Sequence, residues 1–221
     1  MKKILKFMIL TAVIISLTAC KKEIGTEENT ETSIKTVGMT KEEMLEVAEV
    51  AEEVEMNNAL VENIVSAKQT YCDKVLEVTA PVYMIEEDYI LVGQNGSSLI
   101  VYLPEEDIVN LQLKQWITFV GLTNDDIQTE TRKVGPMEFE YQCFVMEHAY
   151  FVTDRYEYMG TPENENDSFA GAWNVAFPGQ SLRKVVYFDE GVDVSQYVGE
   201  EITFTAQYID GKYYNAAIEQ K

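Results

Sequence analysis

The chain has 221 residues, of which 46% are hydrophobic, 11% aromatic and 25% charged, which is enough apolar material for one or two folded domains. Its 17 basic and 38 acidic residues give a formal charge of -21, which argues against a protein whose main role is binding nucleic acid through clustered Lys and Arg. One histidine and three cysteines leave little material for a histidine-based metal centre or a Ser-His-Asp triad.

The first twenty residues have the layout of an export signal. Three lysines precede an apolar stretch over residues 7–17, which is too short to span a membrane with proper flanks. The segment Leu17-Thr18-Ala19-Cys20 resembles the lipobox of bacterial lipoproteins. This resemblance implies removal of residues 1–19, acylation of Cys20, and an exported protein anchored to the bacterial cell membrane through two or three acyl chains. The alternative is an ordinary secretory signal with an incidental cysteine.

Cleavage before Cys20 makes the protein more acidic. It removes three lysines and no acid, so the mature chain has 14 basic and 38 acidic residues and a formal charge of -24. Such a body is repelled by anionic lipid, so we expect membrane contact only through the anchor. Residues 20–39 are mostly polar and predict a flexible tether, the alternative being a tail that a partner recognises.

Residues 40–70 are expected to be helical. Thr40-Lys41-Glu42-Glu43 fits a capping box, in which the Thr hydroxyl and the Glu carboxylate accept from backbone donors at a helix start. Apolar residues then recur with helical spacing at Met44, Val47, Ala48, Ala51, Val54, Leu60, Val61, Ile64 and Val65. An interruption at Asn57-Asn58 leaves open one long helix or two shorter ones. We expect this stripe to cover the end or edge of a barrel, with a partner-binding face as the alternative.

From Cys72 onward the pattern changes to the alternation of β-strands. Leu76, Val78, Ala80, Val82 and Met84 predict one long strand, with a bulge or an edge position at Pro81. Further strands are expected at residues 89–92, 99–103, 116–121 and 139–145, with a turn at Asn95-Gly96, a helix or turn at 105–113 and a linker at 122–138. This order of elements matches a five-stranded OB-fold barrel over residues 71–148.

The remaining residues, 149–221, repeat this plan. Ile117-Thr118-Phe119 recurs as Ile202-Thr203-Phe204, each time after a short helical or turn segment. Strands are expected at residues 150–159, 173–177, 183–188, 202–204 and 213–218. The predicted fold is therefore mainly β, with two tandem OB-fold-like five-stranded barrels preceded by an α-helix.

Several residues also carry a resemblance to a known family. The stretch from Asn58-Ala59 through Tyr71, the run over residues 74–79, and Val82 and Ile85 resemble the tRNA-anticodon-binding-like OB-fold family of bacterial lipoproteins. Ala80-Pro81 stands where that family usually has a glycine, so the first strand must bend differently. The resemblance covers roughly residues 57–145 and implies a fold; it says almost nothing about function.

Few residues favour catalysis or metal binding. His148 beside Glu147 lacks a second histidine, and the sequence has no phosphate-binding glycine loop, nucleophile elbow or paired Cys-x-x-Cys, so we expect a non-enzyme without a cofactor. Glu163, Asn164, Glu165 and Asp167 form an oxygen-rich segment that is a weak candidate for calcium, without the spacing of a known calcium loop. Cys72 and Cys143 could pair in an exported protein, and two buried thiols are the favoured alternative.

Aromatic residues are the better candidates for ligand binding, because OB barrels stack sugars or bases on exposed rings. The five candidates are Trp116, Tyr102, Trp173, Tyr187 and Tyr208. The acid excess favours an envelope protein, a neutral glycan or a cationic peptide over nucleic acid as the partner.

Three hypotheses for function follow. The first is a lipid-anchored envelope protein with a non-catalytic binding or assembly role through its barrels. The second is a lipoprotein that binds a glycan or another small ligand for uptake, which requires aromatic residues to gather in one groove. The third is an envelope hydrolase with two carboxylates in one cleft.

Overall fold

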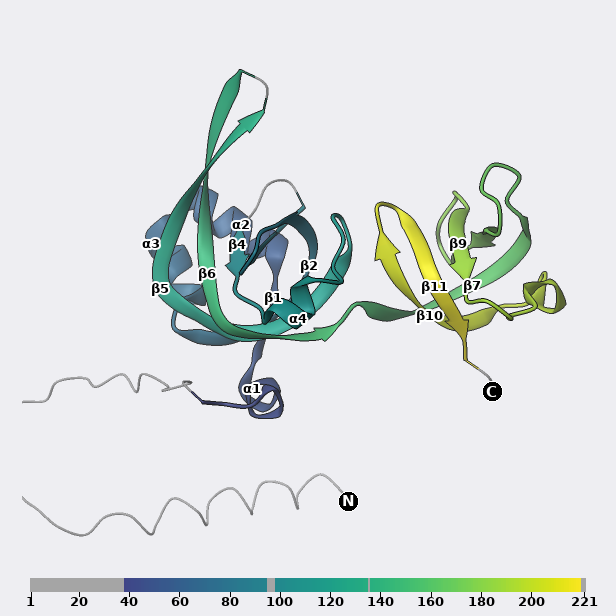
Figure 1. The fold of residues 1–221 in the computed structure, drawn as a ribbon, viewed down its shortest axis with the longest axis horizontal. Helices are drawn as coiled ribbons and strands as arrows, with labels where there is room; N and C mark the ends of the chain where they lie inside the picture. Colours follow the sequence, from purple (N-terminus) through teal and green to yellow (C-terminus); the bar gives the residue numbers. More distant parts are fainter. Residues whose placement is uncertain (1–37, 95–97, 135, 220–221) are drawn as a thin grey trace, which may run out of the picture. The chain divides into compact units, whose positions relative to one another are not determined.

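The computed structural model describes residues 38–94, 98–134 and 136–219, which form two β-structures (Figure 1). The N-terminal sheet has the strand order β1-β2-β3-β4-β6-β5, and the C-terminal barrel is a closed set of strands in the order β10-β11-β9-β8-β7. The predicted signal peptide, Cys20, the Asn95-Gly96 turn and the predicted tether up to residue 37 lie outside the described residues.

The region between residues 40 and 71 contains three short helices and one strand. Helix α1 (Lys41–Val47) is followed by strand β1 (Glu49–Glu52), helix α2 (Glu53–Glu62) and helix α3 (Ile64–Tyr71). The predicted capping box is confirmed, because the Thr40 N–H donates to Glu43 Oε2 at 2.8 Å and the Glu43 N–H donates to Thr40 Oγ1 at 3.3 Å. The expectation of one or two helices over residues 40–70 is wrong, because β1 pairs in parallel with β2.

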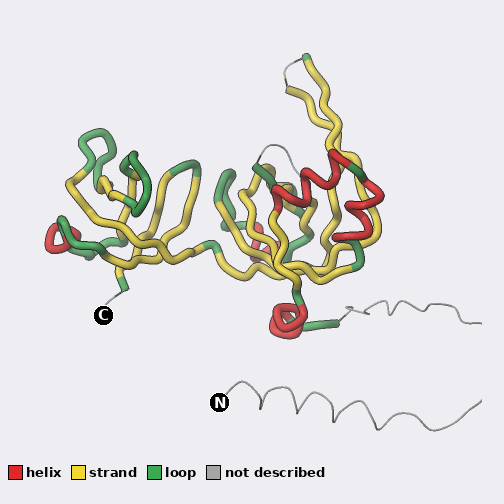
Figure 2. Tube along the Cα trace, turned by 180° about the vertical axis from the view of Figure 1, so that it is seen from behind, coloured by secondary structure: helices red, strands yellow, loops and turns green. Residues whose placement is uncertain are grey.

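The interruption of the apolar stripe at Asn57-Asn58 does not divide two helices, since both residues lie inside α2. The break falls at Asn63, whose Oδ1 accepts from the N–H groups of Val65 and Ser66 at 3.0 and 3.2 Å. The predicted stripe does not form one continuous buried face, because β1 interrupts the helical period: Val47, Val54, Val61 and Val65 are exposed. Met56 and Leu60 of α2 are instead buried in the same core as residues of the strands. Helices α2 and α3 lie beside these strands (Figure 2).

The predicted strands of the first barrel are found. Strand β2 (Lys74–Ile85) buries the predicted face, with Leu76, Val78, Ala80 and Val82 at most 1% exposed. Its pairing with β3 (Ile90–Val92) has a bulge between Val82 and Met84, next to Pro81. Strand β3 pairs antiparallel with β4 (Leu99–Val101), and helix α4 (Glu105–Ile108) follows.

The predicted linker at residues 122–138 is wrong, because the chain there forms a long β-ribbon. Strand β5 (Trp116–Val134) and strand β6 (Met137–Thr153) pair along most of their lengths. The polar residues that predicted a linker lie at a register shift between Thr123 and Ile127. Regular pairing then resumes and continues to Val134 opposite Met137. The ribbon extends beyond the rest of the N-terminal sheet (Figure 1).

The C-terminal barrel follows the predicted strands closely. Strands β7 (Arg155–Glu165), β8 (Trp173–Ala176) and β9 (Lys184–Phe188) precede the 3-10 helix η1 (Val194–Tyr197), and strands β10 (Ile202–Ile209) and β11 (Lys212–Ile218) complete it. The predicted boundary at residue 148 falls inside β6, which continues to Thr153. The predicted strand at residues 150–159 is therefore divided between β6 and β7.

Both β-structures use the same order of pairings. In the N-terminal sheet the pairings form a circuit, because β2 pairs with β3 and β5 while β4 pairs in parallel with β6. In the C-terminal barrel β7 pairs with β8 and β10, while β9 pairs in parallel with β11. The repeated Ile-Thr-Phe segments lie at equivalent places, in β5 and β10, with both isoleucines and both phenylalanines buried.

The position of the helix break is testable by comparing two asparagines. Asn63→Ala removes the side-chain cap of α3 and should lower the free energy of unfolding by about 1 kcal/mol. Asn58→Ala replaces an exposed residue inside α2 and should leave stability equal or slightly higher, because Ala has the better helix propensity. Urea unfolding of both variants measures this difference, and a larger loss for Asn58→Ala would contradict the observed break.

Candidate functional site

The Asp154 carboxylate lies where the N-terminal sheet meets the C-terminal barrel. Asp154 is the one residue between β6 and β7. Its Oδ2 accepts from Gln115 Nε2 at 2.7 Å and also from Gln207 Nε2. Gln115 precedes β5 and Gln207 belongs to β10, so one carboxylate joins an amide from each β-structure. Gln115 is 2% exposed, so its amide depends on this hydrogen bond.

Backbone and side-chain contacts reinforce this junction. Gln115 forms an antiparallel bridge with Ile209, and the Asp210 N–H donates to the Lys114 carbonyl at 3.4 Å. Lys114 Nζ donates to Asp210 Oδ1 at 2.8 Å in an exposed ion pair. The rings of Trp116 and Tyr208 lie 6.3 Å apart between centroids. The two β-structures therefore meet through strand ends, with no long linker between them.

A pocket of about 480 Å³ opens at this junction, and we call it the junction pocket. Five aromatic residues line it: Trp116, Tyr156, Tyr158, Tyr208 and Tyr213. Its other lining residues are Thr79, Gln180 and Lys184. Among the described residues that line it there is no carboxylate, histidine, cysteine or serine. Such a surface offers flat apolar faces and hydrogen-bonding groups, which suits the binding of a ring.

The inner wall of the junction pocket consists of rings that pack on one another. Tyr158 lies 4.7 Å from Tyr213 and 5.9 Å from Phe204 between ring centroids, within the core of the C-terminal barrel. Burial raises the pKa of Tyr213 to about 12 and raises that of Tyr158 as well. Both phenols therefore keep their protons at neutral pH.

A chain of hydroxyl groups forms another wall. Thr79 Oγ1 lies 2.7 Å from Thr118 Oγ1, which lies 3.1 Å from the Tyr156 hydroxyl. Thr118 is 4% exposed, whereas Thr79 and Tyr156 both line the pocket. Burial is the main cause that raises the pKa of Tyr156. These hydroxyls can donate to, or accept from, the hydroxyl groups of a ligand.

A second pocket of about 440 Å³ shares Trp116 and Tyr208 with the junction pocket. Pro81, Tyr83 and Leu113 contribute to it, together with the paired Lys114 and Asp210. The two rings therefore form a shared wall.

Two of the five predicted aromatic residues come together, and three do not. Trp116 and Tyr208 meet at the junction. Tyr102 packs on Tyr89 in a separate cluster on the N-terminal sheet. Trp173 packs against the core of the C-terminal barrel, and Tyr187 stacks on Tyr214 with 4.9 Å between centroids.

Sequence reasoning missed Asp154, Lys184 and the tyrosines Tyr156, Tyr158 and Tyr213. The alternation of Tyr156 and Tyr158 in β7 was a usable signal, because residues two apart share one face of a strand. Asp154 offered no such signal, since its two partners come from positions far away in the sequence.

A disulfide between Cys72 and Cys143 was the less favoured possibility, and it is not formed. Both side chains are thiols, Cys143 buried and Cys72 only partly buried. Cys72 packs against the main core of the N-terminal sheet, whereas Cys143 is buried in the cluster with Leu91 and Ile100. Burial raises the pKa of the Cys72 thiol to about 11.

The oxygen-rich segment does not converge on a cation. Glu163 is held by Arg183 through two contacts of 2.8 Å, which lower the pKa of the carboxyl group. The Asn164 amide donates to the Glu165 carbonyl at 2.7 Å, and Glu163, Asn164 and Glu165 belong to β7. Within the part of the chain that the structure describes, no three His, Cys, Asp or Glu side chains are placed to hold a metal ion. His148 is exposed in β6, with a φ of 50° beside the bulge opposite Gly121.

Comparison with known protein families and with characterised proteins finds no match to this chain. Across the described residues, no helix is long and apolar enough to cross a bilayer. Function therefore has to be argued from the chemistry of the junction.

The Asp154 junction is testable by its cost to stability. Asp154→Ala leaves the buried Gln115 amide without its acceptor and should lower the free energy of unfolding by about 1–3 kcal/mol. Asp210→Ala also removes a carboxylate at this junction, but from an exposed ion pair, and should cost less than about 1 kcal/mol. Denaturant unfolding of the two variants compares them, and equal small losses would show that Asp154 does not hold the junction.

Proposed function

We propose that this protein is a lipid-anchored envelope lipoprotein that binds a small ring-shaped ligand, such as a glycan, in the junction pocket without catalysing a reaction. The observation that carries this proposal is the gathering of five aromatic side chains in one pocket formed by both β-structures. Gathered rings favour the hypothesis of ligand binding over that of an assembly protein, which needs no such pocket.

We also propose that the two β-structures are tandem OB folds. Strands are counted here from β2 in the N-terminal sheet and from β7 in the C-terminal barrel. In both, they pair in the order first, second, third, fifth, fourth and back to the first. A short helix lies between the third and fourth strands of each. The parallel pairing of the third and fifth strands occurs in both. This order supports an OB fold, and the fold by itself names no ligand.

A non-catalytic role is supported by the lining of the pocket. Hydrolysis of a glycoside by the usual route needs two carboxylates in one cleft. The described residues that line the junction pocket include none, and Asp154 beside it already accepts two amide hydrogen bonds.

The binding proposal can be tested with a fluorescent glycoside, methylumbelliferyl β-glucoside. We expect saturable binding that Trp116→Ala weakens about tenfold or more, because stacking on one aromatic ring contributes about 1–3 kcal/mol. Tyr187→Ala is the matched control, since Tyr187 stacks on Tyr214 outside the pocket. Absence of saturable binding, or equal weakening by both substitutions, would refute the proposal, and release of free methylumbelliferone would support a hydrolase instead.

The anchor can be tested by cell fractionation of the full chain in a bacterial host. Cys20→Ser should move the protein from the membrane fraction to the soluble exported fraction, because the acylated thiol is lost. Cys72→Ser is the control and should stay with the membrane. Retention of Cys20→Ser in the membrane would contradict lipid anchoring.

A further inference from the structure

Lys184 holds an unusual position at the mouth of the C-terminal barrel. It is the first residue of β9, and successive side chains of a strand point to opposite faces. Val186 and Phe188 contribute to the barrel core, so Lys184 lies on the same face, two residues before the first of them. Its side chain lines the junction pocket together with Trp116 and Tyr208.

The ammonium group of Lys184 has no ion-pair or hydrogen-bond partner among the described residues. Four other cations of this acidic chain are paired with carboxylates. The pairs are Lys74 with Glu49, Lys114 with Asp210, Arg155 with Asp189, and Arg183 with Glu163. Arg183, the immediate neighbour of Lys184, donates to the Glu163 carboxylate through two contacts of 2.8 Å.

The two pockets at the junction therefore differ in charge. In the second pocket Lys114 is neutralised by Asp210 at 2.8 Å. In the junction pocket Lys184 is the only ionic group among the described lining residues. Asp154 lies close enough to raise the pKa of Tyr156, yet it does not line the pocket and is engaged by two amides. A local positive site thus lies inside a protein whose net charge is strongly negative.

The remaining polar groups indicate what else the ligand carries. Thr79, Tyr156 and Gln180 offer hydroxyl and amide groups, and the protonated phenols of Tyr158 and Tyr213 add further donors. A ring with several hydroxyl groups can form hydrogen bonds with these groups, whereas an aromatic ring without polar substituents cannot.

We propose that the junction pocket selects an acidic sugar, a pyranose ring with one carboxylate, which packs its ring on Trp116 and Tyr208 and places its carboxylate on Lys184. This inference rests on the proposed function and makes it more specific. The acid excess of the chain excludes polyanions by long-range repulsion, while a single carboxylate close to Lys184 forms a charge-assisted hydrogen bond.

The test uses two probes that differ only in the carboxylate, methylumbelliferyl β-glucuronide and methylumbelliferyl β-glucoside. The wild-type protein should bind the glucuronide about tenfold or more tightly than the glucoside, and added salt should reduce this preference. Lys184→Gln should abolish the preference by weakening only the glucuronide. Lys184→Arg should retain most of the preference for the glucuronide. This result would show that the site needs a cation and that a protein with a substituted pocket still folds.

Lys212→Gln is the matched control, because it removes the same charge from the neighbouring β11, where the Lys212 ammonium lies over the Phe169 ring. The proposal is overturned if the wild type binds both probes equally, or if Lys212→Gln reduces the preference as much as Lys184→Gln. Equal binding of both probes that Trp116→Ala still weakens would leave the proposed function standing and refute only the acidic sugar.

Discussion

The Asp154 carboxylate is the contact on which the rest of this structure depends. It accepts from Gln115 and Gln207, and it occupies the one position between β6 and β7. Two hydrogen bonds between Thr153 and Arg155 brace the same connection. With the chain and the side chains both held here, Trp116 and Thr79 from one β-structure meet Tyr158, Lys184 and Tyr208 from the other. The junction pocket exists only while this arrangement holds.

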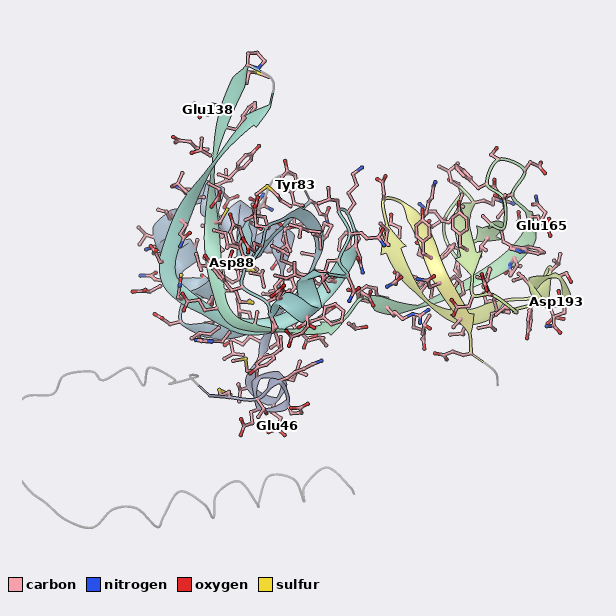
Figure 3. The ribbon with its side chains drawn as sticks, in the orientation of Figure 1. Glu46, Tyr83, Asp88, Glu138, Glu165 and Asp193 are labelled. Carbon is pink, nitrogen blue, oxygen red and sulfur yellow. The ribbon has the colours of Figure 1, made fainter. Side chains whose placement is uncertain are left out.

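The acid excess takes on a more specific meaning beside this pocket. Labelled carboxylates in Figure 3, such as Glu46 on α1, Glu138 on the ribbon and Asp193 before η1, extend from elements spread over the chain. None of the described residues that line the junction pocket is acidic. A net charge of this kind favours solubility and repels anionic lipid. Lys184, which has no ion-pair partner among the described residues, gives the junction pocket a local preference for an anionic group.

How much could be predicted depended on whether the signal was local. The alternation in β2 and the capping box at Thr40 were correctly predicted, because each follows from neighbouring residues. The helix break at Asn63 was missed since Asn57-Asn58 carries the same local signal, and only packing of Met56 and Leu60 decides between them. The ribbon was missed because Asp125 and Asp126 suggest a loop, whereas pairing with β6 resumes beyond them. Trp116 and Tyr208 were found as aromatic candidates, but their meeting depends on Asp154, which no local pattern reveals.

The central claim is that the N-terminal sheet and the C-terminal barrel form one rigid body around Asp154. Backbone amide relaxation by NMR measures this directly, because it reports the rotational correlation time of each part separately. We expect the same correlation time for amides of β2 to β6 and of β7 to β11, and we expect Asp154→Ala to make the C-terminal barrel tumble faster than the N-terminal sheet. Shorter and different correlation times for the two parts of the unsubstituted protein would contradict the account, since two independently moving parts could not hold a shared pocket.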